Sequence, residues 1–212
     1  MRAKSWRFGL TAFFCVGVAG YAIWAYGGGV QRVPVHPDMV DAFDAHRVLI
    51  TVHAVAASIA LLLGPTQFLD AWRARAPRAH RLAGYLYLVL GVGVGGSTGV
   101  LLARHSFGGF VSHAGFGLLG CLWLFTGFMA LLSAKRRRYA EHRTWMIRNF
   151  ALSLAAVTLR IYLPLSVVAG VPFEQFYPAV AWLCWVPNLI VAEWGWKTPG
   201  ERASPMSRPA GG

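Results

Sequence analysis

Six apolar stretches dominate the pattern of hydrophobic and polar positions along the chain, and polar segments separate them. A helix needs about 20 predominantly apolar residues to cross roughly 30 Å of hydrocarbon at about 1.5 Å per residue. Each stretch is close to that length, so the pattern predicts an all-α fold, a polytopic membrane bundle of about six transmembrane helices. The predicted spans are residues 8–26, 47–69, 82–103, 111–134, 145–169 and 177–194.

Two polar segments are longer than the others. Residues 27–46 carry Pro34, Pro37 and an acidic stretch from Asp38 to Asp44, which could form a short helix against the membrane surface. Residues 197–212 are rich in Gly, Pro and Ser, a composition typical of disorder. The sequence therefore predicts one transmembrane helical domain over residues 1–196, followed by a disordered cytoplasmic tail.

Lysine and arginine residues are distributed unequally between the two sides of the predicted membrane. Most of the 20 lie before the first span, between the second and third, between the fourth and fifth, and after the sixth. The opposite segments hold Arg32, Arg47 and Arg104 beside acidic residues. Short loops rich in Lys and Arg stay in the cytoplasm. We therefore expect both termini on the cytoplasmic side of a bacterial inner membrane.

Composition excludes a soluble domain and changes the interpretation of the charge. Hydrophobic residues make up 56% of the chain and charged residues 13%, and the mean hydropathy is +0.49. The formal net charge of +12 could indicate nucleic-acid binding, but the sequence has neither a soluble basic face nor a binding module. We interpret the charge as a topology signal, and we expect the lipid bilayer rather than nucleic acid as the partner.

The sequence lacks the usual signatures of hydrolytic and nucleotide-binding enzymes. No Ser or Cys nucleophile can be combined with a base and an orienting acid, and no phosphate-binding loop or dinucleotide fingerprint is present. Cys15, Cys121 and Cys184 lie within spans without paired spacing, so we interpret them as small apolar side chains. Any enzymatic activity would be that of a membrane oxidoreductase or electron carrier.

Histidine positions reveal a weak internal repeat. His53 lies in the outer part of the second span and His113 at the outer start of the fourth, whereas His80 and His142 open the third and fifth spans from the inner side. In a four-helix bundle, His53 can face His113 near the outer leaflet, and His80 can face His142 near the inner one. Bundles build cofactor sites from side chains on facing helices, and imidazole is an axial ligand of haem iron. The repeat therefore predicts metal ligation of haem b at one or both levels.

This layout resembles the ascorbate-reducible diheme cytochromes b, in which four consecutive helices each contribute one histidine. The resemblance lies in spacing and topology between His53 and His142, and is an analogy at fold level. It implies bis-histidine ligation, with ligands paired between alternate helices. Arg160 and Arg148, toward the outer and inner parts of the fifth span, lie at levels where haem propionates need a cation. Both arginines could instead reach the nearby membrane interfaces.

Each histidine also has a simpler interpretation. His80 and His142 stand next to arginines in basic segments, where they could contact lipid phosphates. His53 and His113 could bond a backbone carbonyl or a neighbouring hydroxyl within their apolar runs. We expect the other histidines to be solvated in outer loops, although His105 could replace His113 as a ligand. These loop histidines are His36, His46 and His105.

Small and polar positions mark the inward faces of two spans. Gly91, Gly95 and Gly99 recur every four residues in the third span, which lets another helix or a flat cofactor approach the backbone. Helix packing is the commoner explanation of such a pattern. Asn149 and Ser153 of the fifth span are also four residues apart and share a face. We expect that face to line the bundle interior or a wet cavity.

A second resemblance covers most of the chain from His53 onward. It rests on the run from His142 to Leu152 that continues through Arg160 to Tyr162-Leu163-Pro164, on Gly64-Pro65-Thr66-Gln67-Phe68, and on His80-Arg81 followed by Gly84 and Tyr87. These residues are similar to the signature of a bacterial family of predicted membrane proteins, domain of unknown function 2306. The resemblance implies a multipass membrane protein and brings no established reaction.

Three classes of function remain open. The leading hypothesis is a transmembrane electron-transfer protein that ligates haem b with one or both histidine pairs, and that exchanges electrons with a quinone or another redox partner. The main alternative is a non-redox transporter or channel in which the histidines and the two arginines of the fifth span line a path for protons or an anion. The third is a structural assembly factor, whose polar residues hold the helices together.

Overall fold

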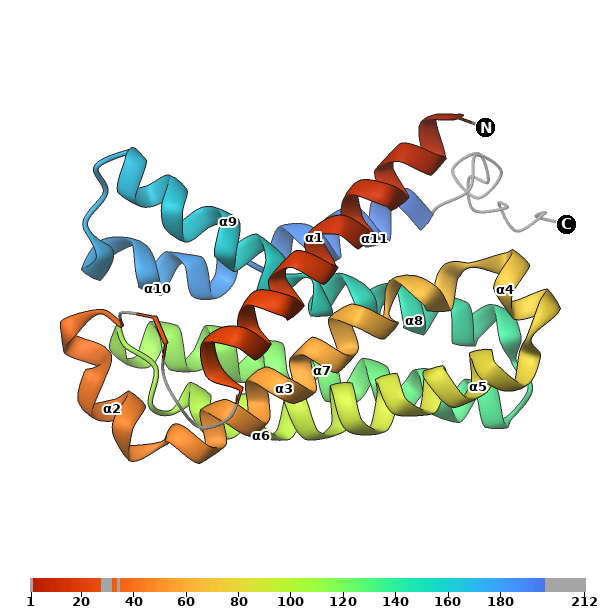
Figure 1. Cartoon of the computed structure of the whole chain (residues 1–212), viewed down its shortest axis with the longest axis horizontal. Helices are drawn as coiled ribbons and strands as arrows, with labels where there is room; N and C mark the ends of the chain where they lie inside the picture. The colour runs from red at the N-terminus through yellow and green to blue at the C-terminus, as the bar shows by residue number, and fades with distance from the viewer. Residues whose placement is uncertain (1, 28–31, 34, 197–212) are drawn as a thin grey trace, which may run out of the picture.

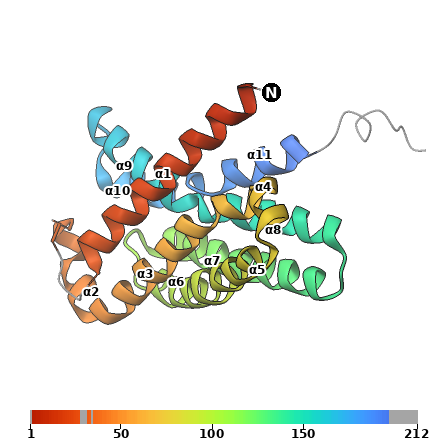
Figure 2. The same cartoon turned by 45° about the vertical axis from the view of Figure 1, so that its right-hand side comes forward.

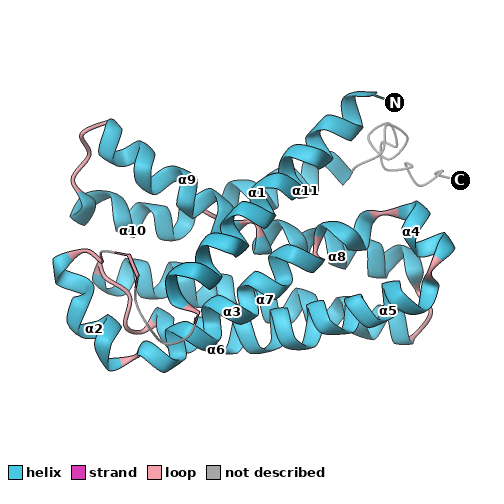
Figure 3. Ribbon diagram, viewed as in Figure 1, coloured by secondary structure: helices cyan, strands magenta, loops and turns pink. Residues whose placement is uncertain are grey.

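The structure is a computed structural model that describes residues 2–27, 32–33 and 35–196. Within these residues every regular element is a helix (Figure 3). Six helices are long and apolar enough to cross a membrane, namely Trp6–Tyr26, Arg47–Phe68, Pro77–Ala103, Gly109–Lys135, Tyr139–Val168 and Phe173–Trp194. The predicted all-α fold with six spans is therefore confirmed. The tail predicted over residues 197–212 lies outside the described residues.

Several spans are assembled from shorter helical elements. The first three comprise α1 (Arg2–Tyr26); α3 (Arg47–Leu63) with the 3-10 turn η2 (Pro65–Phe68); and α5 (Pro77–Tyr85), the π-helix η3 (Leu86–Val94) and α6 (Gly95–Ala103). The last three comprise α7 (Gly109–Lys135); α8 (Tyr139–Ser153) and α9 (Ala155–Val168); and α10 (Phe173–Leu183) and α11 (Val186–Trp196). Between spans lie η1 (Pro37–Met39), α2 (Val40–Ala45) and α4 (Asp70–Arg75). The short helix considered between Asp38 and Asp44 is thus present as η1 and α2.

The third and fifth spans begin earlier than the hydrophobic pattern predicts. Pro77 starts α5 five residues before the predicted boundary at residue 82, and Tyr139 starts α8 six residues before residue 145. Proline suits the first position of a helix, because its missing N–H has no partner there in any case. Backbone hydrogen bonding continues the helices through basic residues that the hydrophobic pattern leaves outside the spans. As a result, His80 and His142 are helical residues rather than loop residues.

Spans two to five pack side by side in chain order. In Figures 1 and 2, α3, the rod formed by α5 and α6, α7 and α8 run lengthwise together, and α1 crosses them obliquely. The α3 helix packs against η3 and α6, α6 packs against α7, and α7 packs against α8. The second layer is built by α1 on α3, α10 on α7 and α9, and α11 on α8. Spans two to five therefore form the bundle that the histidine repeat requires.

Three spans depart from a regular α-helix partway along their length. The fifth breaks at Leu154 between α8 and α9, the sixth breaks between α10 and α11, and the third contains η3. Main-chain bonds continue through both breaks: the Leu154 N–H donates to the Phe150 carbonyl, the Leu154 carbonyl accepts from the Thr158 N–H, and the Trp185 N–H donates to the Trp182 carbonyl. The backbone can therefore bend within the membrane without leaving many polar groups unpaired, as hydrocarbon requires.

A buried polar network joins the third, fourth and fifth spans. The Tyr87 hydroxyl donates to Asn149 Oδ1 (2.6 Å) and lies 3.0 Å from Ser153 Oγ, which also accepts from the Trp123 indole N–H (2.9 Å). Asn149 Nδ2 donates to the Trp123 carbonyl and to Thr126 Oγ1, both at 2.8 Å. A fully satisfied network of this kind fixes how helices face one another. The expected inward face of Asn149 and Ser153 is confirmed, because both side chains are buried.

Gly91 allows the third span to approach α3 closely, which gives a first prediction. A Cβ at this position would lie 2.9 Å from Ala60 Cβ and 3.0 Å from the Ala60 backbone. We expect Gly91→Ala to destabilise the protein by about 1–3 kcal/mol through overpacking. Thermal unfolding in detergent measures the effect. Gly17→Ala is the matched control, since a Cβ there meets nothing within 4 Å. Equal melting temperatures for the two variants would contradict the prediction.

Candidate functional site

A cavity of about 320 Å³ lies inside the bundle, at the end that carries α2 and the turn between α6 and α7. This is the end that the charge distribution predicts to face outward. Residues of α3, α6, α7, α9 and α10 form its walls, and residues of α2 lie at its rim. Ligand sites commonly have volumes of about 300–1,000 Å³ and mostly apolar linings with a few polar groups. The cavity is therefore the candidate site.

His53 forms part of the cavity wall, and its ring is held in place by the third span. Its Nδ1 lies 2.9 Å from the Gly95 carbonyl oxygen and 3.4 Å from Thr98 Oγ1. A carbonyl can only accept, so Nδ1 must carry the proton in this hydrogen bond. In the neutral ring, Nε2 then keeps its lone pair. His53 is thus oriented as an acceptor or ligand at the cavity.

Glycines of the third span form another part of the wall. A Cβ at Gly99 would lie 3.2 Å from His53 Cε1, and a Cβ at Gly95 would lie 3.0 Å from the Trp123 ring. Any larger residue would therefore press on side chains that line the cavity. The glycine pattern in the sequence divides accordingly. Gly91 serves helix packing against α3, whereas Gly95 and Gly99 border the cavity.

Arg160 brings a cation to the same cavity. Its Nη1 donates to the Ala156 carbonyl on its own helix (3.1 Å), and its guanidinium lies 5.7 Å from the centre of the Tyr21 ring. In the described part of the chain, no carboxylate forms an ion pair with this guanidinium. Cations inside a protein usually pair with an anion. A ligand with an anionic or strongly accepting group would complete this site.

Two loop histidines lie at the cavity rather than in open solvent. His46 and His105 both line it, and their ring centres are 3.8 Å apart. His36 is partly buried as well, with its ring stacked on Phe173. The expectation that all three are solvated is therefore wrong for His36 and His46, which are partly buried. It holds for His105, which is exposed. Desolvation, together with neighbouring positive charge from His46, Arg104 and His113, lowers the pKa of His105.

His113 lies near the cavity but is not among the residues that line it. Its Nε2 is 2.9 Å from the Ser106 carbonyl oxygen in the turn between α6 and α7. Phe116, three residues further along α7, does line the cavity. The structure thus places His53 and His105 at the cavity wall and His113 about one helical turn away. A carbonyl contact is the simpler role that the sequence left open for both His53 and His113, and both histidines make one.

The inner histidines lie on facing helices at the opposite end of the bundle. His142 on α8 has its Nδ1 2.8 Å from the Ala130 carbonyl oxygen of α7, which leaves its Nε2 unprotonated in the neutral ring. His80 on α5 has a buried Nδ1 without a hydrogen-bond partner, and its ring packs edge-on against Trp72.

The family of the chain can be assigned. A family described as "Predicted membrane protein (DUF2306)" matches residues 50–196. The chain belongs to this family. No curated protein and no solved structure matches the chain. The multi-pass membrane character of the DUF2306 family agrees with the six spans. The matched region contains His53, Gly95, Gly99 and Arg160, whereas His46 and the α2 rim precede it.

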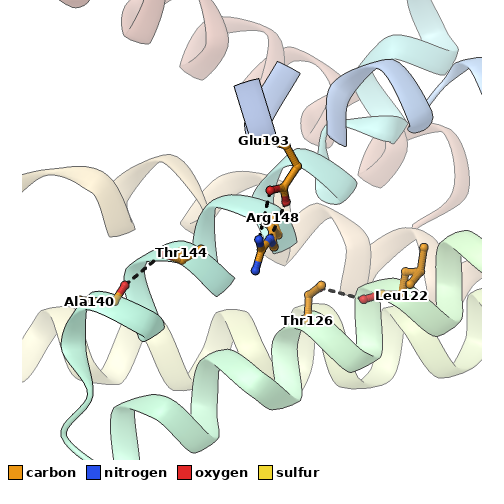
Figure 4. A network of polar contacts seen from close by, with 6 residues as sticks. All are labelled: Leu122, Thr126, Ala140, Thr144, Arg148 and Glu193. Carbon is orange, nitrogen blue, oxygen red and sulfur yellow. Dashed lines mark hydrogen bonds and ion pairs between the residues drawn. The ribbon is translucent and has the colours of Figure 1, made fainter. Parts of the chain in front are cut away.

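Arg148 of this DUF2306 protein has a partner that sequence reasoning missed. Its guanidinium donates to both carboxylate oxygens of Glu193, from Nε to Oε1 and from Nη2 to Oε2 (3.1 Å), across the gap between α8 and α11 (Figure 4). It also lies 4.7 Å from the centre of the Trp145 ring. Arg148 is therefore already neutralised by the protein, unlike Arg160. A helical pattern could not reveal this pair, because the partners are 45 residues apart.

This ion pair gives a second prediction. The side chains of Arg148 and Glu193 are 30% and 44% exposed, so Glu193→Gln leaves a partly buried cation without its anion. We expect a loss of about 1–2 kcal/mol, between the values of surface and buried pairs, and a lower melting temperature. Glu141→Gln is the matched control, because Glu141 pairs with Arg138 through exposed side chains. A larger effect in the control would show that the Arg148–Glu193 ion pair does not hold α11 on α8.

Proposed function

We propose that this protein is a transmembrane electron carrier that binds haem b in the outer cavity, with His53 as an axial ligand. The observation that carries the proposal is the orientation of the His53 ring, whose Nδ1 donates to the Gly95 carbonyl while the residue lines the cavity. Metal-ligating histidines almost always donate their second ring N–H to a carbonyl, carboxylate or water. The bond fixes the tautomer in which Nε2 is available to a metal.

The other walls of the cavity fit a flat, anionic macrocycle. Gly95 and Gly99 leave the third span without side chains beside the His53 imidazole. Arg160 offers guanidinium N–H groups that no protein carboxylate occupies in the described residues, and a propionate would accept from them. Trp123 and Ser153 form the inner end of the cavity and belong to the buried polar network, which keeps that end rigid.

Each residue has a distinct role in this proposal. His53 would bind the haem, Arg160 would neutralise a propionate, and Gly99 leaves room for the His53 imidazole. Haem supplies one-electron chemistry when it is bound. The apolar lining excludes water, which sets the redox potential together with the axial ligands. A quinone or another redox partner would exchange electrons with the site, and the expected setting is a bacterial inner membrane.

Two histidines can provide the second axial ligand, as the sequence left open. His105 already lines the cavity, but it is exposed and its ring lies against that of His46. His113 lies on α7, and its ring would have to release the Ser106 carbonyl to reach the cavity. Comparing variants of the two residues assigns the ligand. At the inner level, the Nδ1 contact of His142 with the Ala130 carbonyl supports the same proposal for His80 and His142.

A second candidate function is the transport of a small anion, and the broken helices favour it. The breaks in the fifth and sixth spans lie beside the cavity, which Ser153, Ala155 and Cys184 line. Membrane carriers often form their binding sites where helices are interrupted near the middle of the bilayer. Arg160 would then hold the transported anion. Anion flux in liposomes tests this candidate.

Haem binding gives the third prediction. The protein purified in detergent, from cells with ample haem supply, should have a Soret band and a reduced-minus-oxidised difference spectrum. His53→Ala should abolish the outer signal, and either His105→Ala or His113→Ala should do the same. Thr98→Val is the matched control, because it removes a neighbouring hydroxyl and keeps the imidazole. A colourless wild-type preparation would contradict the proposal and would favour anion transport.

A steric variant tests the same site with its imidazole intact. In Gly99→Val the new Cβ would lie 3.2 Å from His53 Cε1, and the two added methyl groups would occupy cavity space. We expect haem content to fall strongly, measured as pyridine haemochrome per protein. Gly20→Val on α1 is the control, since a Cβ there meets nothing within 4 Å. Equal haem content in the two variants would place the haem elsewhere.

A further inference from the structure

A second group of ligand-type side chains lies outside the cavity, on the predicted outer face. His36 and Asp38 come from the segment just before α2, and Glu174 comes from the first turn of α10. One ligand atom from each lies within 4.8 Å of the other two. About two-thirds of the chain separates Glu174 from His36 and Asp38 in sequence. The fold therefore brings an imidazole and two carboxylates together from unrelated segments.

The imidazole of this group is positioned but not hydrogen-bonded. Its ring stacks on Phe173 with centroids 4.2 Å apart and planes 13° apart. Nδ1 is buried without a hydrogen-bond partner and lies 3.7 Å from Asp38 Oδ2, while Nε2 lies 3.9 Å from Glu174 Oε1. Both distances exceed the range of N–H···O hydrogen bonds. A ring held in place with a buried, unsatisfied nitrogen needs a partner.

Within the described residues, His36 is the basic side chain nearest to both carboxylates. No Lys or Arg forms an ion pair with Asp38 or Glu174 in the described part of the chain, whereas Asp44 nearby is paired with Arg47. A tetrahedral Zn²⁺ with bonds of about 2.0–2.2 Å holds its ligand atoms roughly 3.3–3.6 Å apart. Because one ion can bind only one nitrogen of the His36 ring, the relevant limit is the one for a single atom from each residue, and these atoms lie within 4.8 Å of one another. Because both carboxylates are more than half exposed, small rotations about their side-chain bonds can close the difference.

We infer that His36, Asp38 and Glu174 form a site for a first-row divalent cation, with Zn²⁺ as the best match. One imidazole with two carboxylates is a donor set that suits zinc, and water would complete the coordination. Hard cations such as Mg²⁺ prefer all-oxygen ligands. The cation would offset the negative charge and bond the buried ring nitrogen. The site does not depend on what the outer cavity binds.

The position of this site suggests a structural consequence. Met39 and Phe43, just after Asp38, lie at the rim of the cavity, and Tyr177, three residues after Glu174, lies in its wall. A cation bound to both segments would therefore connect the rim of the cavity to α10. We expect it to stabilise the contact between these two segments. A ligand that binds only the folded state raises the melting temperature.

Titration of the chelator-treated, full-length protein with Zn²⁺ in detergent tests the site. Isothermal calorimetry should give saturable binding with one high-affinity ion per chain. His36→Gln and Glu174→Gln should each weaken the affinity at least about tenfold, as expected for loss of one ligand. Zn²⁺ should raise the melting temperature of the wild-type protein and not that of either variant. Mg²⁺ should not compete.

Two controls keep the result specific. Asp41→Asn changes an exposed acidic residue on α2 outside the group, and it should bind Zn²⁺ as the wild type does. His105→Gln tests whether the adjacent histidines His46 and His105 bind the ion instead. Should a tested variant fold poorly without Zn²⁺, Asp38→Asn replaces it. The inference is overturned if the wild type shows no saturable binding, or if His105→Gln weakens binding while His36→Gln and Glu174→Gln do not. Haem content is measured separately and does not affect this outcome.

Discussion

The constraint on which the rest of this structure depends is that polar groups within the hydrocarbon must find partners inside the protein. Tyr87, Trp123 and Asn149 come from three different spans and satisfy one another together with Ser153. Because each span contributes donors and acceptors at fixed positions, only one rotation of each helix completes the set. The network therefore specifies the mutual orientation of the spans, which apolar contacts with lipid or with each other could not do.

The candidate site is built on that network. Trp123 and Ser153 take part in the buried hydrogen bonds and also form the inner end of the cavity. The same rotation of the third span that turns Tyr87 inward presents Gly95 and Gly99 to His53. Arg148 and Arg160 lie twelve residues apart in the fifth span. They differ in the partners of their guanidinium groups. One is neutralised by Glu193, and the other is left with a backbone carbonyl and an aromatic ring.

Much of the fold could be predicted from the sequence, because the length of an apolar stretch and the distribution of charge are local properties. The inward face of Asn149 and Ser153 was also predictable, since it follows from a spacing of four residues within one helix. The contact between Arg148 and Glu193 was not, because it joins two helices whose relative rotation the pattern does not determine. For the same reason, the sequence could pair His53 with His113 only by height in the membrane.

The loop histidines illustrate a further limit. A polar segment between spans predicts exposure, but the structure folds residues 36–46 back over the end of the bundle, so that His36 and His46 are partly buried. Backbone irregularities were equally hidden. Leu154 is an ordinary apolar residue, and the residues next to it do not predict the break in the fifth span. The hydrophobicity of a residue indicates how deep it lies in the membrane, but it carries little information about local helix geometry.

The π-helix η3 has a consequence for how the third span relates its two ends. Wide turns advance each residue through a smaller angle than α-helical turns, so the nine residues of Leu86–Val94 change the phase between the segments on either side. The side that His80 presents is thus offset, relative to Gly99, from the side that an uninterrupted α-helix would present. A single helix can in this way direct side chains into two chemically different environments at two depths. The length of the π-helical segment determines the rotation between its two ends.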